Sequence, residues 1–433
     1  TLSATAPNNP FTTPVALAFP ATNITAEAVT ETTSSRFLAG LVVRLPARWS
    51  AGLDYVWART RQRGRVPQVV VGDPDGTGPG LSYTAALAAG ALNVMRDLNA
   101  YPLDYTAYSP PEPNLRSHAM FRPAEVTVRG SGPLRRLPAG EMTLSVSALY
   151  RYERTPGNVR STPSSASPAI AYSYEPTVGL ETRAYTAELN VPVFAADAAS
   201  GWRRGLELQL AARRDEGMAT VRGDSPSGIS VAGPDGPFPG VSYVKPDFAD
   251  TTGTAGFKYS PVKDLTFRGS WGTGFLMPTI TQLTSSAPTF GSFTITDPWR
   301  NNVSTNTPFL NIGGGNPNLK PEKSESLSGG VILTPRFLPG FRFSVDYTHI
   351  TKTDELGSLS NNLLFANEDL FPERIVRAPL TDADRALGYT RGAIQQIDLR
   401  TTNLSGKRRT AYDFQADYTW KTSSRGEFQF YAL

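Results

Sequence analysis

The sequence predicts an all-β protein that forms a transmembrane antiparallel β-barrel with long extracellular loops and short periplasmic turns. Three observations support this fold class. Apolar and polar residues alternate with a period of two in nearly every ordered segment, the connections between segments alternate between short and long, and aromatic residues lie at the ends of the apolar rows.

The alternation gives each predicted strand one apolar and one polar face. In residues 341–348, for example, Phe341 and Phe343 share one face, whereas Arg342 and Ser344 share the other. Backbone polar groups inside a membrane must all be hydrogen-bonded, so strands of this kind close into a barrel. The apolar face then points to lipid and the polar face to a wet lumen.

We expect about a dozen strands of roughly ten residues, which is long enough for a tilted membrane crossing. The apolar rows end in aromatic residues such as Trp57, Tyr152, Trp271 and Trp420, as in interfacial girdles. The strands are predicted near residues 36–45, 49–60, 122–131, 141–153, 180–192, 205–215, 249–259, 265–274, 324–334, 341–352, 394–420 and 427–433.

The connections between these strands alternate in length. Short links lie at residues 46–48, 132–140, 195–204, 260–264, 335–340 and 422–426. Long links lie at residues 61–121, 154–179, 216–248, 275–323 and 353–393. Loops beyond about 15 residues are uncommon in soluble domains, whereas outer-membrane barrels have short turns at one rim and long loops at the other. The pattern therefore favours a barrel over a soluble β-sandwich, whose strands also alternate.

Composition excludes several classes of function. The 433 residues include no Cys and two His, so disulfide frameworks, thiol catalysis and iron–sulfur ligation are excluded, and little remains for a zinc hydrolase. The 42 basic and 38 acidic residues leave a net charge of +4 that is dispersed along the chain, and we expect no nucleic-acid partner. No run of 18 apolar residues exists, which excludes a helical membrane span.

The predicted polar faces carry carboxylates such as Glu207, Asp346, Asp413 and Asp417, which alternate with Arg and Gln. We interpret them as a solvated lumen wall rather than as the paired acid and base of a glycosidase. The sequence thus predicts no catalytic residue, no metal site, no cofactor and no enzymatic activity.

Two segments carry a resemblance to a known family. Residues 265–283 read LTFRGSWGTGFLMPTITQL, and residues 316–324 read NPNLKPEKS. Both resemble the central barrel signatures of TonB-dependent outer-membrane receptors. The first keeps Gly274, Phe275 and Pro278, while Leu276 and Met277 replace the usual Arg and Ala. The second keeps the whole pattern: Asn316, Pro317, Leu319, Lys320, Pro321 and Glu322.

We interpret these signature residues as structural. Pro317 and Pro321 hold the chain extended and prevent a helix, while Lys320 and Glu322 are placed to pair at the start of a strand. The resemblance covers the chain at strand scale from about Arg36 to the end.

The resemblance implies a 22-stranded barrel plugged by an N-terminal globular domain. Residues 1–433 would then form a partial barrel domain with about 12 of the 22 strands, and the plug domain and C-terminal strands would be absent from this chain. It further implies an outer-membrane location in a Gram-negative bacterium, contact with outer-membrane lipid, and coupling to the TonB complex through the missing N-terminal region.

The function that the resemblance implies is active import of a scarce solute, such as a ferric siderophore, cobalamin or a glycan. We take a ferric siderophore as the default solute. Two alternatives stay open: a passive porin-like or adhesive outer-membrane barrel without a plug, and a secreted glycan-binding β-sandwich.

Ligand contacts are predicted only by location. Tyr105, Trp299 and Arg300 lie on long loops, so they are candidates for ligand contact at the outer mouth. Of the 42 basic residues 34 are Arg, whose guanidinium group suits recognition of carboxylates and other anions. This bias hints at an anionic ligand.

Overall fold

The computed structural model describes most of the chain, with gaps in several connections. The described residues are 2–16, 29–67, 89–98, 100–101, 114–163, 170–195, 204–223, 229–233, 236, 240–285, 288–292, 295–305, 308–404 and 406–433. Among them, no helix is both long and apolar enough to cross a membrane.

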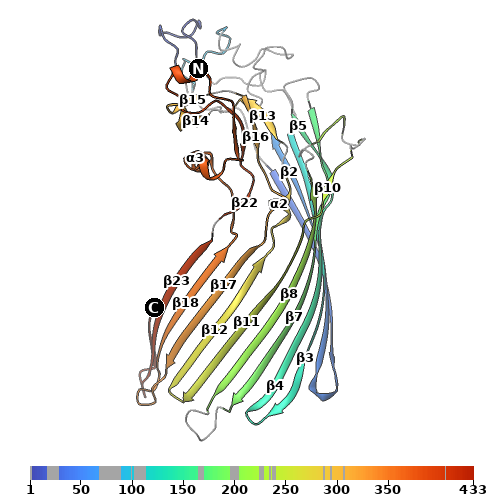
Figure 1. The fold of residues 1–433 in the computed structure, drawn as a ribbon, viewed down its shortest axis with the longest axis vertical. Helices are drawn as coiled ribbons and strands as arrows, with labels where there is room; N and C mark the ends of the chain where they lie inside the picture. The colour runs from blue at the N-terminus through green and yellow to red at the C-terminus, as the bar shows by residue number, and fades with distance from the viewer. Residues whose placement is uncertain are drawn as a thin grey trace.

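Twelve long strands of the described residues form one curved antiparallel sheet, which we call the wall (Figure 1). Each wall strand pairs with the wall strands next to it in the chain, and the end strands β1 and β24 have one such partner each, so the wall is a simple meander. The wall strands are β1 (Val29–Arg44), β2 (Ser50–Pro67), β3 (Asn114–Leu137), β4 (Gly140–Thr155), β7 (Val178–Phe194), β8 (Leu206–Arg222), β11 (Asp247–Val262), β12 (Leu265–Leu276), β17 (Glu322–Leu333), β18 (Phe341–Thr353), β23 (Lys407–Lys421) and β24 (Glu427–Ala432).

These positions confirm the predicted meander of about a dozen strands, with one clear correction. The predicted strand at 394–420 is three elements: β21 (Ile394–Asp398), β22 (Thr402–Asn403) and the wall strand β23. The chain breaks after Asp398 because this carboxylate accepts hydrogen bonds from the backbone and the guanidinium group of Arg400, which turns the chain. Several strands also extend beyond their predicted ends, and β3 is the longest of them.

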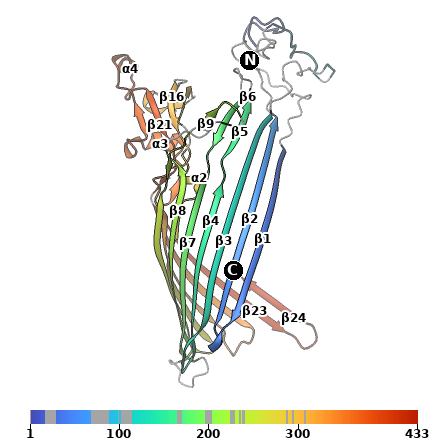
Figure 2. The ribbon, with the colours of Figure 1, turned by 90° about the vertical axis from the view of Figure 1, so that its right-hand side faces the viewer.

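The connections divide the wall into two different rims. Short turns join the strands at the lower rim in Figure 2, for example the 3-10 helix η1 (Pro46–Arg48) between β1 and β2. Long connections join them at the opposite rim, and two of these carry strands that extend the sheet. The additional strands are β5 (Asn158–Pro163), β6 (Ile170–Glu175), β9 (Ile229–Val231) and β10 (Tyr243–Val244).

Two other long connections, residues 277–321 and 354–406, fold together above the wall, and we call them the loop cap (Figure 2). Their central sheet has the order β13-β16-β21-β20 and joins the two connections through a parallel pair, β16 with β21. The elements of the loop cap, besides β21 and β22, are α2 (Ile280–Leu283), β13 (Thr289–Ser292), β14 (Ile295–Asp297), η3 (Pro298–Arg300), β15 (Val303–Thr305), β16 (Pro308–Ile312), β19 (Leu356–Gly357), α3 (Asn361–Ala366), η4 (Glu368–Leu370), β20 (Ile375–Arg377) and α4 (Asp382–Ala386).

The two faces of the wall follow from the register. Arg268 on β12 lies opposite Gly330 on β17, and Gly330 lies opposite Asp346 on β18. Because Gly330 has no side chain, the guanidinium group of Arg268 reaches over it and donates to both oxygens of Asp346, at 2.9 and 2.6 Å. Charged pairs of this kind mark the inward face. The other face carries exposed apolar side chains such as Phe257 and Trp271.

Candidate functional site

The two signature segments meet where the wall joins the loop cap. Directly after Pro278, Thr279 and Gln282 form a capping box that starts the short helix α2. The Thr279 hydroxyl accepts a bond from the Gln282 amide at 3.4 Å, and the Gln282 side chain accepts one from the Thr279 amide at 2.9 Å. This sequence pattern therefore ends the strand and turns the chain inward.

The second signature segment begins against the end of this helix. The amide of Gly315 donates to the Thr284 carbonyl at 2.9 Å, and the amide of Asn316 donates to the Gln282 carbonyl at 2.7 Å. A Cβ atom at Gly315 would overlap the Gln282 carbonyl, so glycine is required for this approach. The two motifs are thus joined by their backbones.

The residues that follow are fixed to the second long connection. Asn316 Nδ2 donates to the Thr401 carbonyl at 3.2 Å. The Lys320 amide donates to Asn403 Oδ1, and Asn403 Nδ2 donates back to the Lys320 carbonyl, both at 2.8 Å. Pro317 and Pro321 keep this segment out of regular helix and strand.

Glu322 corrects one sequence prediction. Its carboxylate does not pair with Lys320; it lies 2.9 Å from Lys352 Nζ and accepts a 2.6 Å bond from the Leu356 amide. Lys320 is exposed, whereas Glu322 is 7% exposed and lies beside the neighbouring strand, which supplies the closer cation.

An apolar cluster, which we call the junction core, holds the signature segments on the wall. It consists of Ala219 and Val221 from β8, Phe248 from β11, and Leu283 and Leu319 from the loop cap, with Phe275 packed against it. Pro278 is fully buried nearby. Gly274 lies opposite Ser324, whose hydroxyl occupies the space of a Cβ atom. All of these contacts are packing or hydrogen bonds within the chain.

A cavity of about 1180 Å³ lies beside the junction core, between the inward face of the wall and the loop cap. Its lining combines apolar side chains such as Leu149 and Leu180 with the ion pairs Arg151–Glu153 and Arg213–Asp215, the latter at 2.8 Å. The sequence reasoning did not select these arginines as site residues. Their position on the polar face of alternating strands was the signal available.

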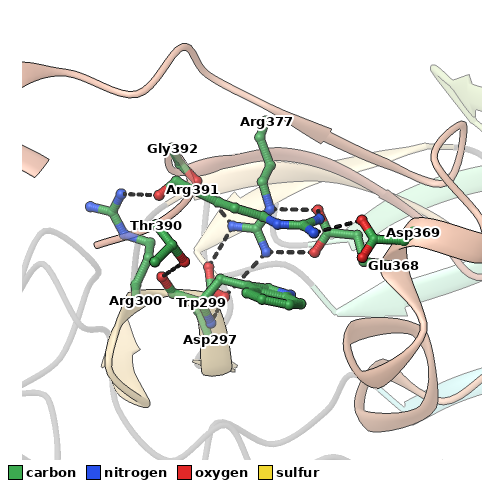
Figure 3. A network of polar contacts seen from close by, with 9 residues as sticks. All are labelled: Asp297, Trp299, Arg300, Glu368, Asp369, Arg377, Thr390, Arg391 and Gly392. Carbon is green, nitrogen blue, oxygen red and sulfur yellow. Dashed lines mark hydrogen bonds and ion pairs between the residues drawn. The ribbon is translucent and has the colours of Figure 1, made fainter. Parts of the chain in front are cut away.

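The loop cap holds two of the predicted ligand-contact residues, Trp299 and Arg300, within a network of polar contacts (Figure 3). The guanidinium carbon of Arg391 lies 4.1 Å from the centroid of the Trp299 ring. Arg300 lies 4.2 Å from the centroid of the Tyr389 ring and pairs with Asp384 at 2.8 Å. The third predicted residue, Tyr105, lies outside the described residues.

Arg377 is the centre of this network (Figure 3). It donates to Asp297 Oδ2 at 2.6 Å and to Glu368 Oε1 at 2.8 Å. The exposed fractions of the three side chains are 9%, 2% and 6%, respectively. Two buried carboxylates therefore share one buried guanidinium group, whose fork geometry suits both.

Asp384 has the most clearly shifted pKa of the loop cap. Hydrogen bonds from the side chain and backbone of Thr381, and then the ion pair with Arg300, lower the pKa of this carboxyl from 3.8 to about 2. The described residues contain no group of three or more His, Cys, Asp or Glu side chains arranged to hold a metal ion.

The sequence matches the family model described as TonB dependent receptor-like, beta-barrel, over residues 3–432. This match confirms the predicted fold class and the predicted family resemblance. No curated protein matches the chain.

Several solved structures are similar in part. The hemophore receptor HasR of Serratia marcescens, in complex with its hemophore HasA and heme, is 12% identical, with 89% of this chain and 52% of that chain covered and a TM-score of 0.40. A mutant of the ferric enterobactin receptor PfeA of Pseudomonas aeruginosa is 10% identical, with coverages of 92% and 51% and a TM-score of 0.44. The copper transporter OprC is 12% identical, with coverages of 90% and 44% and a TM-score of 0.45. The chain spans about half the length of these structures.

Proposed function

Because this chain belongs to the TonB-dependent receptor β-barrel family, whose members are outer-membrane proteins of Gram-negative bacteria, we propose that it works in the active import of a scarce solute, with a ferric siderophore as that solute. Members of this family are transport receptors and not enzymes. The proposal includes a plug domain and a segment that contacts the TonB complex, which the family resemblance places before the barrel.

The observation that carries the proposal is the cavity between the wall and the loop cap. Its volume of about 1180 Å³ exceeds the roughly 300 to 1,000 Å³ of an ordinary small-molecule pocket. It lies on the inward face and combines apolar surface with arginine–carboxylate pairs, whose half-exposed guanidinium groups can also bind the catecholate or carboxylate groups of a large solute.

The cavity arginines are better placed for a solute than the residues predicted from the loops. All three arginines have a carboxylate partner, but the side chains of Arg151 and Arg213 are 45% and 47% exposed, whereas that of Arg300 is 14% exposed. Contact of a ligand with Tyr105, Trp299 or Arg300 stays a prediction.

Uptake of radiolabelled iron tests the proposal. The complete receptor is expressed in a Gram-negative strain without its own siderophore receptors, with and without TonB, and supplied with a panel of iron-loaded siderophores. We expect TonB-dependent uptake of at least one of them. Uptake that is unchanged without TonB, or absent across the panel together with normal insertion in the outer membrane, would overturn the proposal.

A pair of variants connects the uptake to the cavity. Arg151→Gln combined with Arg213→Gln removes two charge-assisted contacts and is expected to weaken siderophore binding about tenfold or more. Arg129→Gln is the matched control, since Arg129 also lies on the inward face and pairs with Asp54 at 3.1 Å, yet does not line the cavity. Binding should be unchanged in this control.

A further inference from the structure

A row of arginines lies on the outward face of the wall at the border of its apolar band. On β2, Arg59, Arg61 and Arg63 follow Trp57 at every second position. On the next two strands, Arg122 comes two residues before Ala124 on β3, and Arg154 comes two residues after Tyr152 on β4. We call Arg59, Arg61, Arg63, Arg122 and Arg154 the arginine belt.

Alternation places the arginine belt on the lipid-facing side. Trp57 lies opposite Phe37, and Tyr55, two residues earlier, is 38% exposed. Leu53 and Val128 continue the same face toward the centre of the wall and are 44% and 50% exposed. The order on β2 and β4 is thus apolar, aromatic and then cationic, and on β3 it is apolar and then cationic; this is the order of acyl chains, interface and headgroups in a membrane.

The arginine belt lacks its own counter-charges. No ion pair between described residues includes any of its five members, and Glu31, opposite Arg63, is the acidic residue that the register brings nearest. Arg122 and Arg154 lie directly opposite each other, an arrangement of like charges that destabilises a sheet. The Nε atom of Arg122 donates to the Met120 sulfur at 2.9 Å, which is only a weak acceptor.

A small hollow in the arginine belt holds an unsatisfied donor. Its volume is about 160 Å³, and it is lined by Arg59, Arg61 and Arg63 together with Glu31, Thr33 and Ser35. The Nε atom of Arg61 is buried and has no hydrogen-bond partner among the described residues. A buried donor without a partner is costly, so an external acceptor at this position would lower the free energy.

The short-turn rim of the same wall shows the contrast. There Arg48 pairs with Glu141, Arg336 pairs with Asp264 at 2.7 Å, and Lys421 pairs with Glu427 at 3.3 Å. These three cations therefore have carboxylate partners within the chain. Cations of the arginine belt present their guanidinium groups outward instead.

We propose that the arginine belt binds the phosphate groups of lipid headgroups in the outer leaflet of the outer membrane. Guanidinium groups bind phosphate through paired hydrogen bonds, and the hydroxyls of Thr33 and Ser35 add donors at the hollow. The apolar band below receives the acyl chains of the same lipid. This site faces away from the cavity, so it is independent of the proposed transport function.

Lipid binding to the complete receptor in detergent micelles tests the proposal. The probe is lipid A with both phosphates, compared with the same lipid after dephosphorylation, and bound lipid is counted by native mass spectrometry. Replacing Arg59, Arg61, Arg122 and Arg154 by Gln is expected to weaken binding of the phosphorylated lipid by about tenfold or more. The wild type is expected to bind the dephosphorylated lipid more weakly by a similar factor.

Charge-matched controls keep the test sharp. Arg136, opposite Glu141 at the end of β3, and Arg425, in the turn between β23 and β24, lie at the short-turn rim with Arg48 and Arg336. Replacing these four arginines by Gln removes the same charge as the belt variant and should leave lipid binding unchanged, whereas Lys at the four belt positions should retain most of it. The proposal is overturned if the belt variant binds like the wild type, if dephosphorylated lipid binds equally well, or if inorganic phosphate displaces the lipid at equal phosphate concentration. The comparison of the two lipids needs no variant, so it decides even if the belt variant does not fold.

Discussion

The wall and the loop cap solve the same problem, the placement of apolar side chains, in opposite ways. On the wall, Leu41 and Phe414 are 59% and 57% exposed. In the loop cap, Leu364 is fully buried and Ile397 is 1% exposed, within a cluster of eight buried apolar residues. The wall thus relies on lipid for its apolar contacts, while the loop cap, which projects into water, must build its own core.

Ion pairs show the same contrast. The inward pair of Arg268 and Asp346 on the wall has side chains that are 48% and 26% exposed, so water screens it. The pairs of Arg377 in the loop cap are almost fully buried. Removal of one partner of an ion pair should therefore lower the free energy of unfolding far more in the loop cap than on the wall.

The sharpest test of this contrast is Arg377→Met. It leaves the buried Asp297 carboxylate without its cation and leaves Glu368 with Arg391 alone, at 2.8 Å, and we expect the loop cap to lose about 3 to 5 kcal/mol of stability. Hydrogen exchange of the β20 and β21 amides measures this loss. The control is Arg385→Met, whose partner Asp382 is fully exposed; its effect should stay below about 0.5 kcal/mol. Equal protection in both variants would show that the buried network is not stabilising.

Truncation of one leucine in each region is the next largest effect. Leu364→Ala opens a cavity in the loop-cap core and should cost about 3 kcal/mol. Leu41→Ala on the outward face should cost less than about 1 kcal/mol, because lipid or detergent fills the space. Chemical denaturation of each variant in the same detergent, followed by exchange or fluorescence, gives the two values. A large loss for Leu41→Ala would mean that the wall also depends on protein packing.

Two adjacent glycines test the two faces of one strand. A Cβ atom at Gly330 would overlap the Asp346 carboxylate, so Gly330→Ala should displace the Arg268 bond and cost about 1 to 3 kcal/mol. At Gly329 the nearest atom is a backbone oxygen 4.0 Å away, and Gly329→Ala should change stability by less than about 0.5 kcal/mol. The midpoint of heat-induced gel mobility change compares them. Similar midpoints would contradict the assigned inward face.

The smallest effect concerns acid. The pKa of Asp384 in the folded protein is about 2, below its ordinary value of 3.8. The ionised carboxylate therefore stabilises the loop cap at pH values above 3.8. The contribution is lost as the pH falls from 3.8 through about 2. Digestion of the loop cap by pepsin should therefore accelerate over this interval. In Asp384→Asn the digestion rate should change less over this pH interval than in the wild type. The same acceleration in both proteins would contradict the assignment to Asp384.

Sequence reasoning predicted the wall well because strand order in a meander is chain order. The alternation in residues 341–348 states which side chains share a face, and this face is the same whichever strand lies beside it. The loop cap could not be predicted in this way. Residues 394–398 were predicted as the first part of the wall strand that ends at 420, yet β21 pairs with β16 at Leu310↔Gln396, across two long connections.

In the candidate site, too, the local motifs were predictable from the sequence and the contacts between distant segments were not. The sequence identified Gly274, Phe275 and the segment 316–322, but it offered Lys320 as the partner of Glu322, where the structure has Lys352. For the cavity residues Arg151 and Arg213, the sequence showed only that they lie on the polar face of their strands. Their common cavity depends on the loop cap above them.

By itself, the sequence determined the all-β class, the meander of the wall, its two faces and the family. Each of these follows from local periodicity or from short contiguous motifs. Only the tertiary structure decided that residues 277–321 and 354–406 build one core and that Arg377 joins two buried carboxylates. It also decided that arginines from three strands lie together in one outer belt. The physical reason is that these features come from contacts between residues far apart in the chain, which no local pattern records.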